Sequence, residues 1–232
     1  MVEAAPSRVL ADTLNLDILE HVHRFRMTTQ HAVQRLLMDS YDLEGVKTRL
    51  RRLQERGFLA QQQLWANSKC YHLTPKAAKQ VFGESSRAGQ PLRGRPLKEA
   101  FATLTFCTFH DPPLHKFTRK DFTKAYPDLV ATGLPAQAYY READEHKRIG
   151  FIIVDCGADS RNLVRKCKKV VRTRFKHTPW RQQILDDRFL VTIITALPTK
   201  QRRLQELLAE ETELREVTFR VVLCPDLANL LD

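Results

Sequence analysis

The chain has 232 residues, which is long enough for one large domain or two small ones, each with its own hydrophobic core. Its apolar fraction of 43% excludes wholesale disorder. An excess of 38 Lys and Arg over 27 Asp and Glu gives a net charge of +11, which favours a polyanionic partner such as nucleic acid, although the same charge can serve solubility alone.

The five cysteines are isolated in the sequence, and no CxxC or CxxxH pair occurs. This spacing argues against a zinc ribbon, the odd number argues against a disulfide framework, and most of the thiols are interpreted as small buried hydrophobes. The N-terminus lacks a basic segment followed by an apolar run, and no stretch approaches the roughly 18 apolar residues of a membrane span. We therefore expect a cytoplasmic, nucleoid-associated protein with no membrane partner.

Three short amphipathic helices are predicted in the first third of the chain, over residues 14–25, 27–37 and 43–56. Thr28 or Thr29 can cap the second helix, and a glycine at position 57 can end the third because it adopts a left-handed backbone without strain. A tight turn before the third helix is typical of a helix-turn-helix. The apolar stripe of the third helix consists of Leu43, Val46, Leu50 and Leu53.

A β-hairpin and a fourth helix are predicted to follow. The β-prone runs "FLAQQQLW" and "CYHL" are separated by the turn sequence "ANSK". In "TPKAAKQVFG", Thr74 can cap the helix, Pro75 suits its first turn and Gly83 ends it. The element order, together with "TRLRRLQERGFL…YHLTPKAAK", resembles winged helix-turn-helix DNA-binding proteins over residues 12–83.

This resemblance implies that the third helix enters the major groove of duplex DNA. With the apolar stripe packed inward, a rotation of 100° per residue points Thr48, Arg51 and Arg52 outward, and arginine can pair bidentately with guanine. Lys47 and Arg51 could also reach phosphates from the flank, and Lys69 lies at the hairpin tip. A winged helix that binds protein instead is the alternative. The predicted DNA contacts of this domain are Thr29, Gln30, Lys47, Thr48, Arg51, Arg52 and Lys69.

Two domains are predicted from the change in pattern along the chain. A winged-helix domain covers residues 1–83, a basic linker covers residues 84–96, and a second domain covers residues 97–232. Strands and helices alternate in the second domain, which indicates an α/β sandwich with a mixed sheet. The expected fold class is therefore α+β or α/β with two domains. The aromatic residues predicted for the core of the helix that opens the second domain are Phe101, Phe106 and Phe109.

The chain also resembles the plasmid replication–relaxation family, through its element order and short strings such as "FIIVDCGADS". In that family a winged helix precedes a domain of restriction-endonuclease-like fold. The resemblance implies a nuclease site with two carboxylates on Mg²⁺ and a lysine near the attacking water. However, the first carboxylate position reads Pro135-Ala136, and Gly157 stands where the lysine is expected, two residues after Asp155. We therefore expect an inactive domain without a resident cofactor.

A Mg²⁺-dependent DNA endonuclease stays open as an alternative, with its ligands drawn from other positions. In the simpler interpretation, Asp155 orders the loop before the next helix or caps that helix. The candidate nuclease residues are Asp155, with Glu142 or Asp144 as a second carboxylate and Lys166 or Lys169 as the ammonium group.

The predicted helix over residues 159–175 and the segment after it carry nine basic residues without an acidic one. A solvated helix usually mixes both signs of charge, so this run indicates a phosphate-facing surface. Trp180 follows the helix and is expected to pack in the core. The nine residues are Arg161, Arg165, Lys166, Lys168, Lys169, Arg172, Arg174, Lys176 and Arg181, and the predicted DNA contacts among them are Arg161, Arg165, Lys168, Lys169 and Arg172.

The combined expectation is a DNA-binding protein of a mobile element, plasmid or host system, acting in replication, transposition, defence or transcription control. Its winged helix would read double-stranded DNA, and its basic second domain would grip the backbone or dock a protein. A homodimer that spans two half-sites is compatible with this expectation, as is a protein partner in a DNA-transaction complex. The alternatives from other classes are the endonuclease and an adaptor that holds protein instead of DNA.

Overall fold

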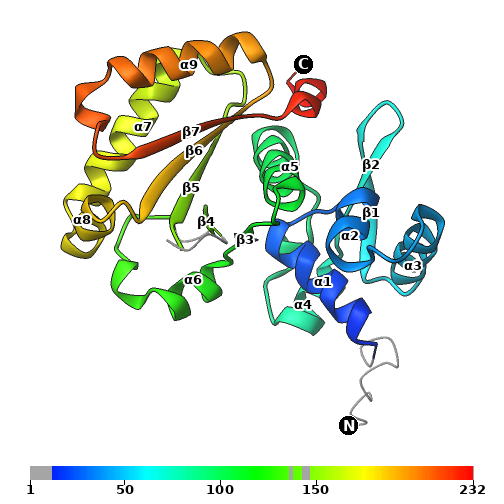
Figure 1. The fold of residues 1–232 in the computed structure, drawn as a ribbon. Helices are drawn as coiled ribbons and strands as arrows, with labels where there is room; N and C mark the ends of the chain where they lie inside the picture. The colour runs from blue at the N-terminus through cyan, green and yellow to red at the C-terminus, as the bar shows by residue number, and fades with distance from the viewer. Residues whose placement is uncertain (1–11, 136–137, 143–146, 232) are drawn as a thin grey trace. The chain divides into compact units, whose positions relative to one another are not determined.

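The computed structural model describes residues 12–135, 138–142 and 147–231. The described residues form a mixed α/β structure with two sheets, and the chain divides into two compact units, Met1–Leu104 and Thr105–Asp232 (Figure 1). Within these described ranges, no helix is long and apolar enough to cross a membrane.

Unit 1 begins with three helices, continues with a two-stranded antiparallel sheet and ends with further helices (Figure 1). Its elements are α1 (Thr13–Phe25), α2 (Gln30–Leu37), α3 (Leu43–Glu55), β1 (Leu59–Trp65), β2 (Ser68–Leu73), α4 (Pro75–Phe82), the 3-10 turn η1 (Ser86–Gly89) and the first part of α5 (Gly94–Phe109).

Local sequence signals set the ends of these helices. The Thr29 and Thr74 hydroxyls accept hydrogen bonds from the backbone N–H groups of the first turns of α2 and α4, which lack partners within the helix. Gly57 after α3 and Gly83 after α4 adopt left-handed conformations with φ of 75° and 66°. The predicted caps and helix ends are therefore confirmed at all four positions.

The predicted stripe of α3 forms part of the core of unit 1. Val46, Leu50 and Leu53 are at most 1% exposed, and they pack with residues of α1, α2 and the hairpin. Full burial of each such side chain contributes roughly 1.5–3 kcal/mol, so the stripe fixes which face of α3 points outward.

A short backbone bridge ties the start of α2 to the hairpin. The Thr28 N–H donates to the Tyr71 carbonyl at 2.8 Å, and the Tyr71 N–H donates to the Thr28 carbonyl at 2.9 Å. Thr28 thus lies beside β2 as a third extended segment. Beneath it, the buried His21 ring places Nε2 2.9 Å from Thr28 Oγ1. The bridge fixes the hairpin against α1 and α2.

The segment predicted as a linker, residues 84–96, packs on unit 1 instead. Gly89 lies so close to the Thr74–Pro75 backbone that a Cβ atom there would collide with it. Leu92 is buried, and its carbonyl accepts a hydrogen bond from Gln62 Nε2 at 2.8 Å. The boundary between the units therefore lies later than predicted, inside α5, because one glycine and one leucine anchor the segment.

Unit 2 contains a five-stranded mixed sheet in the order β3-β4-β5-β6-β7. The first three strands pair antiparallel, and β5, β6 and β7 pair parallel, so the predicted mixed sheet is confirmed. The elements are β3 (His115–Lys116), α6 (Arg119–Ala125), η2 (Pro127–Leu129), β4 (Tyr139–Arg141), β5 (Ile149–Val154), α7 (Ser160–Phe175), α8 (Thr178–Leu185), β6 (Phe189–Thr195), α9 (Pro198–Glu210), η3 (Thr212–Leu214), β7 (Thr218–Leu223) and η4 (Pro225–Leu230).

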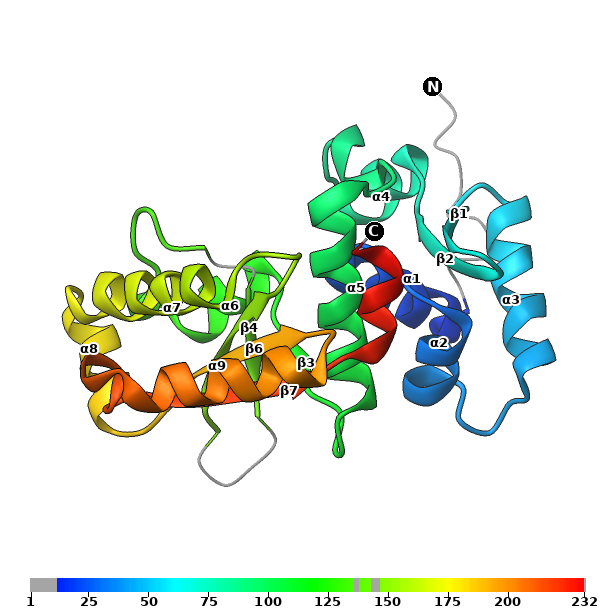
Figure 2. The ribbon, with the colours of Figure 1, turned by 90° about the horizontal axis from the view of Figure 1, so that it is seen from above.

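Helices α7 and α9 lie side by side along one face of this sheet (Figures 1 and 2). Alternate residues of the buried strands, such as Phe151 and Ile193, point into the core that the helices close. Trp180 is fully buried in this core, and its indole N–H donates to the Leu129 carbonyl at 2.8 Å, which confirms that it packs.

Three features of unit 2 and its border differ from expectation. Helix α8 and the two-residue strand β3 were not predicted, although Pro179 occupies the first turn of α8, where proline favours a helix start; β3 is too short to give a pattern. Phe101 and Phe106 are buried as predicted, but the prediction for Phe109 is wrong because it is 50% exposed on the last turn of α5.

The cysteines are free thiols, as the spacing indicated. Cys70, Cys107, Cys167 and Cys224 are buried, and burial raises the pKa of the first three thiols to about 12. A thiol with so high a pKa carries almost no thiolate at neutral pH, so these residues are packing groups rather than nucleophiles.

Candidate nucleic-acid interface

The outward face of α3 carries exposed basic side chains. Arg51 is 68% exposed, Arg52 and Lys47 are exposed, and Thr48 is half-buried beside them. Lys47 Nζ lies 3.1 Å from Glu44, and Arg51 Nε lies 3.7 Å from Glu55, both within the helix. Exposed pairs of this kind contribute well under about 1 kcal/mol, so both cations stay available to an external anion.

Arg49 has a different environment on the flank of α3. Its Nη1 donates to Asp12 Oδ2 at 2.6 Å and to Asn15 Oδ1 at 2.9 Å, which ties α3 to the start of α1. The hydrogen bond from Arg49 is the largest influence that lowers the pKa of Asp12. Next to this contact lies a pocket of about 100 Å³, lined by Asp12, Asn15, Arg49, Arg52, Leu53 and Arg56.

The other predicted contacts of unit 1 lie at the start of α2 and near the hairpin tip. The Thr29 hydroxyl is used as the cap of α2, and Gln30 Nε2 donates to the Tyr71 hydroxyl at 3.0 Å. Gln30 therefore holds the helix start against the hairpin, whereas Thr29 caps the helix itself. Lys69 is exposed on β2, paired across the hairpin with Gln63. Lys69 is thus free of the core and accessible.

Helix α7 presents a basic stripe on its outer side. Arg161, Arg165, Lys169 and Lys176 are exposed, at a spacing that places them on one side of the helix. The stripe runs along most of a 16-residue helix, which corresponds to roughly 24 Å. Two further cations of the run, Lys168 and Arg172, are engaged differently.

Two glutamates after α9 bind these two cations. Lys168 Nζ lies 2.5 Å from Glu211 Oε2, and Arg172 donates to both carboxylate oxygens of Glu213, at 3.1 Å from Nε and 2.9 Å from Nη2. We call Glu211 and Glu213 the acidic clamp. Although the sequence of the run contains no acid, a different segment supplies the negative charge. The clamp therefore pairs with two of the predicted phosphate contacts.

Arg174 does not belong to that surface, which corrects the interpretation of the basic run. Its side chain is 1% exposed, and its Nη2 donates to the Tyr139 hydroxyl at 2.6 Å. The guanidinium lies 4.2 Å from the centre of the Phe151 ring, and Trp180 and Phe189 complete the aromatic cage. Burial lowers the pKa of Arg174, but the ring faces stabilise its charge.

Asp155 lies at the end of β5 and is 1% exposed. Its carboxylate accepts hydrogen bonds from Thr195 Oγ1 at 2.9 Å, from Lys200 Nζ at 2.9 Å and from the Gly157 N–H at 3.1 Å. Lys200 also donates to the Ala158 carbonyl. Asp155 therefore orders the loop after β5, while the capping role falls to Asp159. No pattern in the sequence points to Lys200, because it lies on a separate helix.

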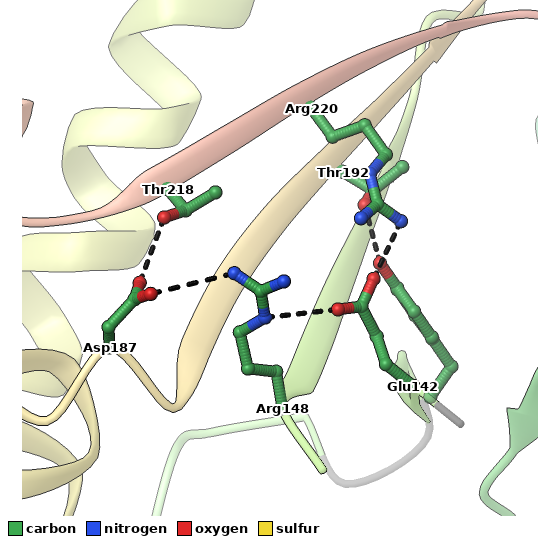
Figure 3. Close-up of polar contacts among 7 residues, drawn as sticks. Glu142, Arg148, Asp187, Thr192, Thr218 and Arg220 are labelled. Carbon is green, nitrogen blue, oxygen red and sulfur yellow. Dashed lines mark hydrogen bonds and ion pairs between the residues drawn. The ribbon is translucent and has the colours of Figure 1, made fainter. Parts of the chain in front are cut away.

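Glu142 follows β4 and is held by two arginines, Arg148 just before β5 and Arg220 on β7 (Figure 3). Arg148 Nε donates to Glu142 Oε2 at 3.1 Å, and Arg220 Nη1 lies 2.6 Å from Oε1 without the alignment of a hydrogen bond. Arg148 also reaches Asp187 at 3.5 Å, and Asp187 accepts from Thr218 at 2.9 Å. The network joins Glu142, just after β4, to residues of β7 and to residues that precede β5 and β6.

The residues of the endonuclease alternative do not converge. Glu142 lies beside Arg148 before the six-residue strand β5, and Asp155 follows its other end, so roughly 20 Å separates them. Lys200, rather than Lys166 of α7, contacts Asp155. Asp144 lies outside the described residues. In the described part of the chain, no three His, Cys, Asp or Glu side chains are placed to hold a metal ion.

The structure therefore places most of the predicted cations on two helices, α3 of unit 1 and α7 of unit 2. On α3, Lys47 and Arg51 pair with acids of their own helix, whereas on α7 Lys168 and Arg172 pair with the acidic clamp. Comparison of the chain with protein-family models, curated proteins and solved structures found no match.

Proposed function

We propose that the protein binds double-stranded DNA and that unit 1 acts as a winged helix-turn-helix, with α3 in the major groove. The observation that carries this proposal is the exposed pair Arg51 and Arg52 opposite the buried stripe of α3. A helix fixed by its own core and carrying arginines outward can present guanidinium groups to guanine edges and to flanking phosphates without rearrangement.

The hairpin supports this proposal as the wing. The bridge between Thr28 and Tyr71 gives the three extended segments that a winged helix requires, and it fixes the hairpin beside α2. Lys69 is exposed near the tip, where an ammonium group would reach a phosphate as a flexible point charge. We infer that Lys69 adds affinity without reading sequence.

For unit 2 we propose a restriction-endonuclease-like fold that grips the DNA backbone without cutting it. The antiparallel β3-β4-β5 followed by parallel β6 and β7 supports the fold, and the exposed cations Arg161, Arg165 and Lys169 support the grip. The biological setting proposed from the resemblance is a mobile element, plasmid or host system.

Fluorescence anisotropy with labelled duplex DNA tests the proposal. Arg51→Ala/Arg52→Ala should weaken binding about tenfold or more, because a bidentate arginine–guanine pair contributes about 1–3 kcal/mol. The matched control is Arg202→Ala/Arg203→Ala on α9, a second adjacent pair in which both residues are exposed and one pairs within its helix. The control should stay within about twofold of the parent.

Two outcomes would contradict the proposal. If the parent protein shows no saturable binding to genomic fragments at low salt, DNA is not the ligand. If the α3 and α9 variants lose equal affinity, net charge rather than the face of α3 accounts for binding.

A further inference from the structure

Three arginines gather on one flank of α3, away from the face that carries Arg51. Arg49, Arg52 and Arg56 are spaced by three and four residues, which places them within about 60° of one another around the helix axis. Together with Asp12 and Asn15 they line the pocket of about 100 Å³. The cluster therefore places three positive charges close together.

The charges in this pocket are not balanced by its own residues. Asp12 supplies the carboxylate of the lining, and its Oδ2 is ion-paired with Arg49 Nη1 at 2.6 Å. Arg52 and Arg56 are exposed, so the lining carries two positive charges beyond the one that Asp12 compensates. Like charges in one concavity repel each other unless an anion joins them, so the pocket favours a negatively charged occupant.

The size and chemistry of the pocket narrow the choice of anion. The pocket of about 100 Å³ is large enough to hold a single tetrahedral oxyanion. Guanidinium groups present planar forks of N–H donors that match phosphate oxygens. Asn15 adds a polar side chain beside Arg49.

We infer that this pocket binds one phosphate group. Arg52 and Arg56 would contact the phosphate directly, and Arg49 would contribute from its fixed position against Asp12 and Asn15. The phosphate is a phosphodiester of bound DNA or free inorganic phosphate. The assignment to a DNA phosphodiester rests on the proposed function, whereas the phosphate-binding pocket itself does not depend on it. In the DNA complex, Arg51 would then read base edges while Arg52 and Arg56 set the register of α3 on the backbone.

The first arm of the test uses inorganic phosphate alone. Melting temperatures are measured in potassium phosphate and in potassium chloride of equal ionic strength, for the parent, for Arg52→Gln/Arg56→Gln and for the control Arg202→Gln/Arg203→Gln. Phosphate stabilises folded proteins in general, and this non-specific rise in melting temperature is common to all three proteins. Specific binding adds a further rise of several degrees in the parent and the control, and this rise should be lost in the pocket variant.

The second arm measures duplex DNA affinity across a salt series for the same three proteins. Loss of one phosphate contact lowers the slope of log affinity against log salt by about one. A pocket variant with a reduced slope identifies the DNA backbone as the source of the phosphate. An unchanged slope, together with the loss of phosphate stabilisation, identifies free phosphate as the ligand and still supports the pocket.

The remaining outcomes separate this inference from the proposed function. Equal phosphate stabilisation in all three proteins overturns the pocket, even if the DNA slope changes, because the arginines then act only as open surface charges. If the parent binds no DNA but phosphate stabilisation is lost in the pocket variant alone, the proposed function fails and the phosphate site stands.

Discussion

Tyr140 and Gly150 lie opposite each other on β4 and β5, and the phenol ring crosses the glycine. A Cβ atom at Gly150 would collide with the ring, and the Tyr140 hydroxyl is held 2.7 Å from the Thr192 hydroxyl. The ring therefore cannot move without breaking a buried hydrogen bond. The ring therefore leaves no room for a side chain at position 150.

Replacing Gly150 with alanine tests this packing of the Tyr140 ring on the glycine. Alanine in a strand is ordinarily more stable than glycine by roughly 0.5–1 kcal/mol, so a loss of stability would have to come from the collision. We expect Gly150→Ala to lower the free energy of unfolding by about 1–3 kcal/mol, measured by urea denaturation. Tyr140→Ala/Gly150→Ala should lose less than the sum of the single variants, and strict additivity would contradict this account.

His21 makes stability depend on pH. Its burial, with a smaller contribution from Arg24, lowers its pKa from 6.5 to about 4. Between these two values the unfolded chain binds more protons than the folded chain, so stability falls as the pH decreases. The free energy of unfolding should decrease by about 2 kcal/mol from pH 7 to pH 5 through this residue. Urea denaturation of His21→Gln should show a much flatter pH profile, and the control His31→Gln, at an exposed position of α2, should not.

Residue-scale prediction succeeded where a local rule decides the outcome. The Thr29 and Thr74 caps follow from the need of a helix start for acceptors, and Gly57 follows from its left-handed backbone. Arg174 could not be predicted, because its cage is built from rings at positions 139, 151, 180 and 189, which only the fold brings together.

At the scale of elements, α7 illustrates how one segment changes the chemistry of another. The acidic clamp, Glu211 and Glu213, follows α9 and pairs with Lys168 and Arg172 of α7. Its carboxylates occupy positions that phosphates would take if α7 contacted a DNA backbone. The clamp should therefore compete with DNA for this helix.

Neutralising the clamp should strengthen DNA binding. We expect Glu211→Gln/Glu213→Gln to raise duplex affinity severalfold at low salt, because two cations become available to phosphates, and the gain should shrink as salt is added. Anisotropy titrations measure the change. The control Glu206→Gln/Glu210→Gln removes the same charge from α9, where Glu206 pairs with Arg203. Equal gains in both variants would show that net charge alone matters.

Most elements were predictable from periodicity, and the exceptions have physical causes. The parallel strands β5 and β6 are continuous apolar runs that only a buried sheet explains. The packing of residues 84–96 was missed because it depends on Gly89 and Leu92, two residues in an otherwise polar stretch. The overall composition of this segment is that of a linker, but its packing is decided by these two residues.

At the scale of the whole molecule, the excess positive charge of +11 is distributed over both units. The face of α3 could be predicted because a 13-residue amphipathic helix fixes its outer side by rotation alone. The arginine pocket could not, because it needs the start of α1 beside α3. The separation of Glu142 from Asp155 likewise required the antiparallel pairing of β4 and β5.

Gly89 provides a criterion for recognising relatives of this protein. The atoms that a side chain at this position would strike belong to the Thr74–Pro75 backbone, which cannot swing aside as a side chain could. Any homologous chain that keeps this path after α4 must therefore conserve glycine at the aligned position. A sequence that shares the helical pattern and the arginines but carries alanine or serine there is expected to follow another path after α4.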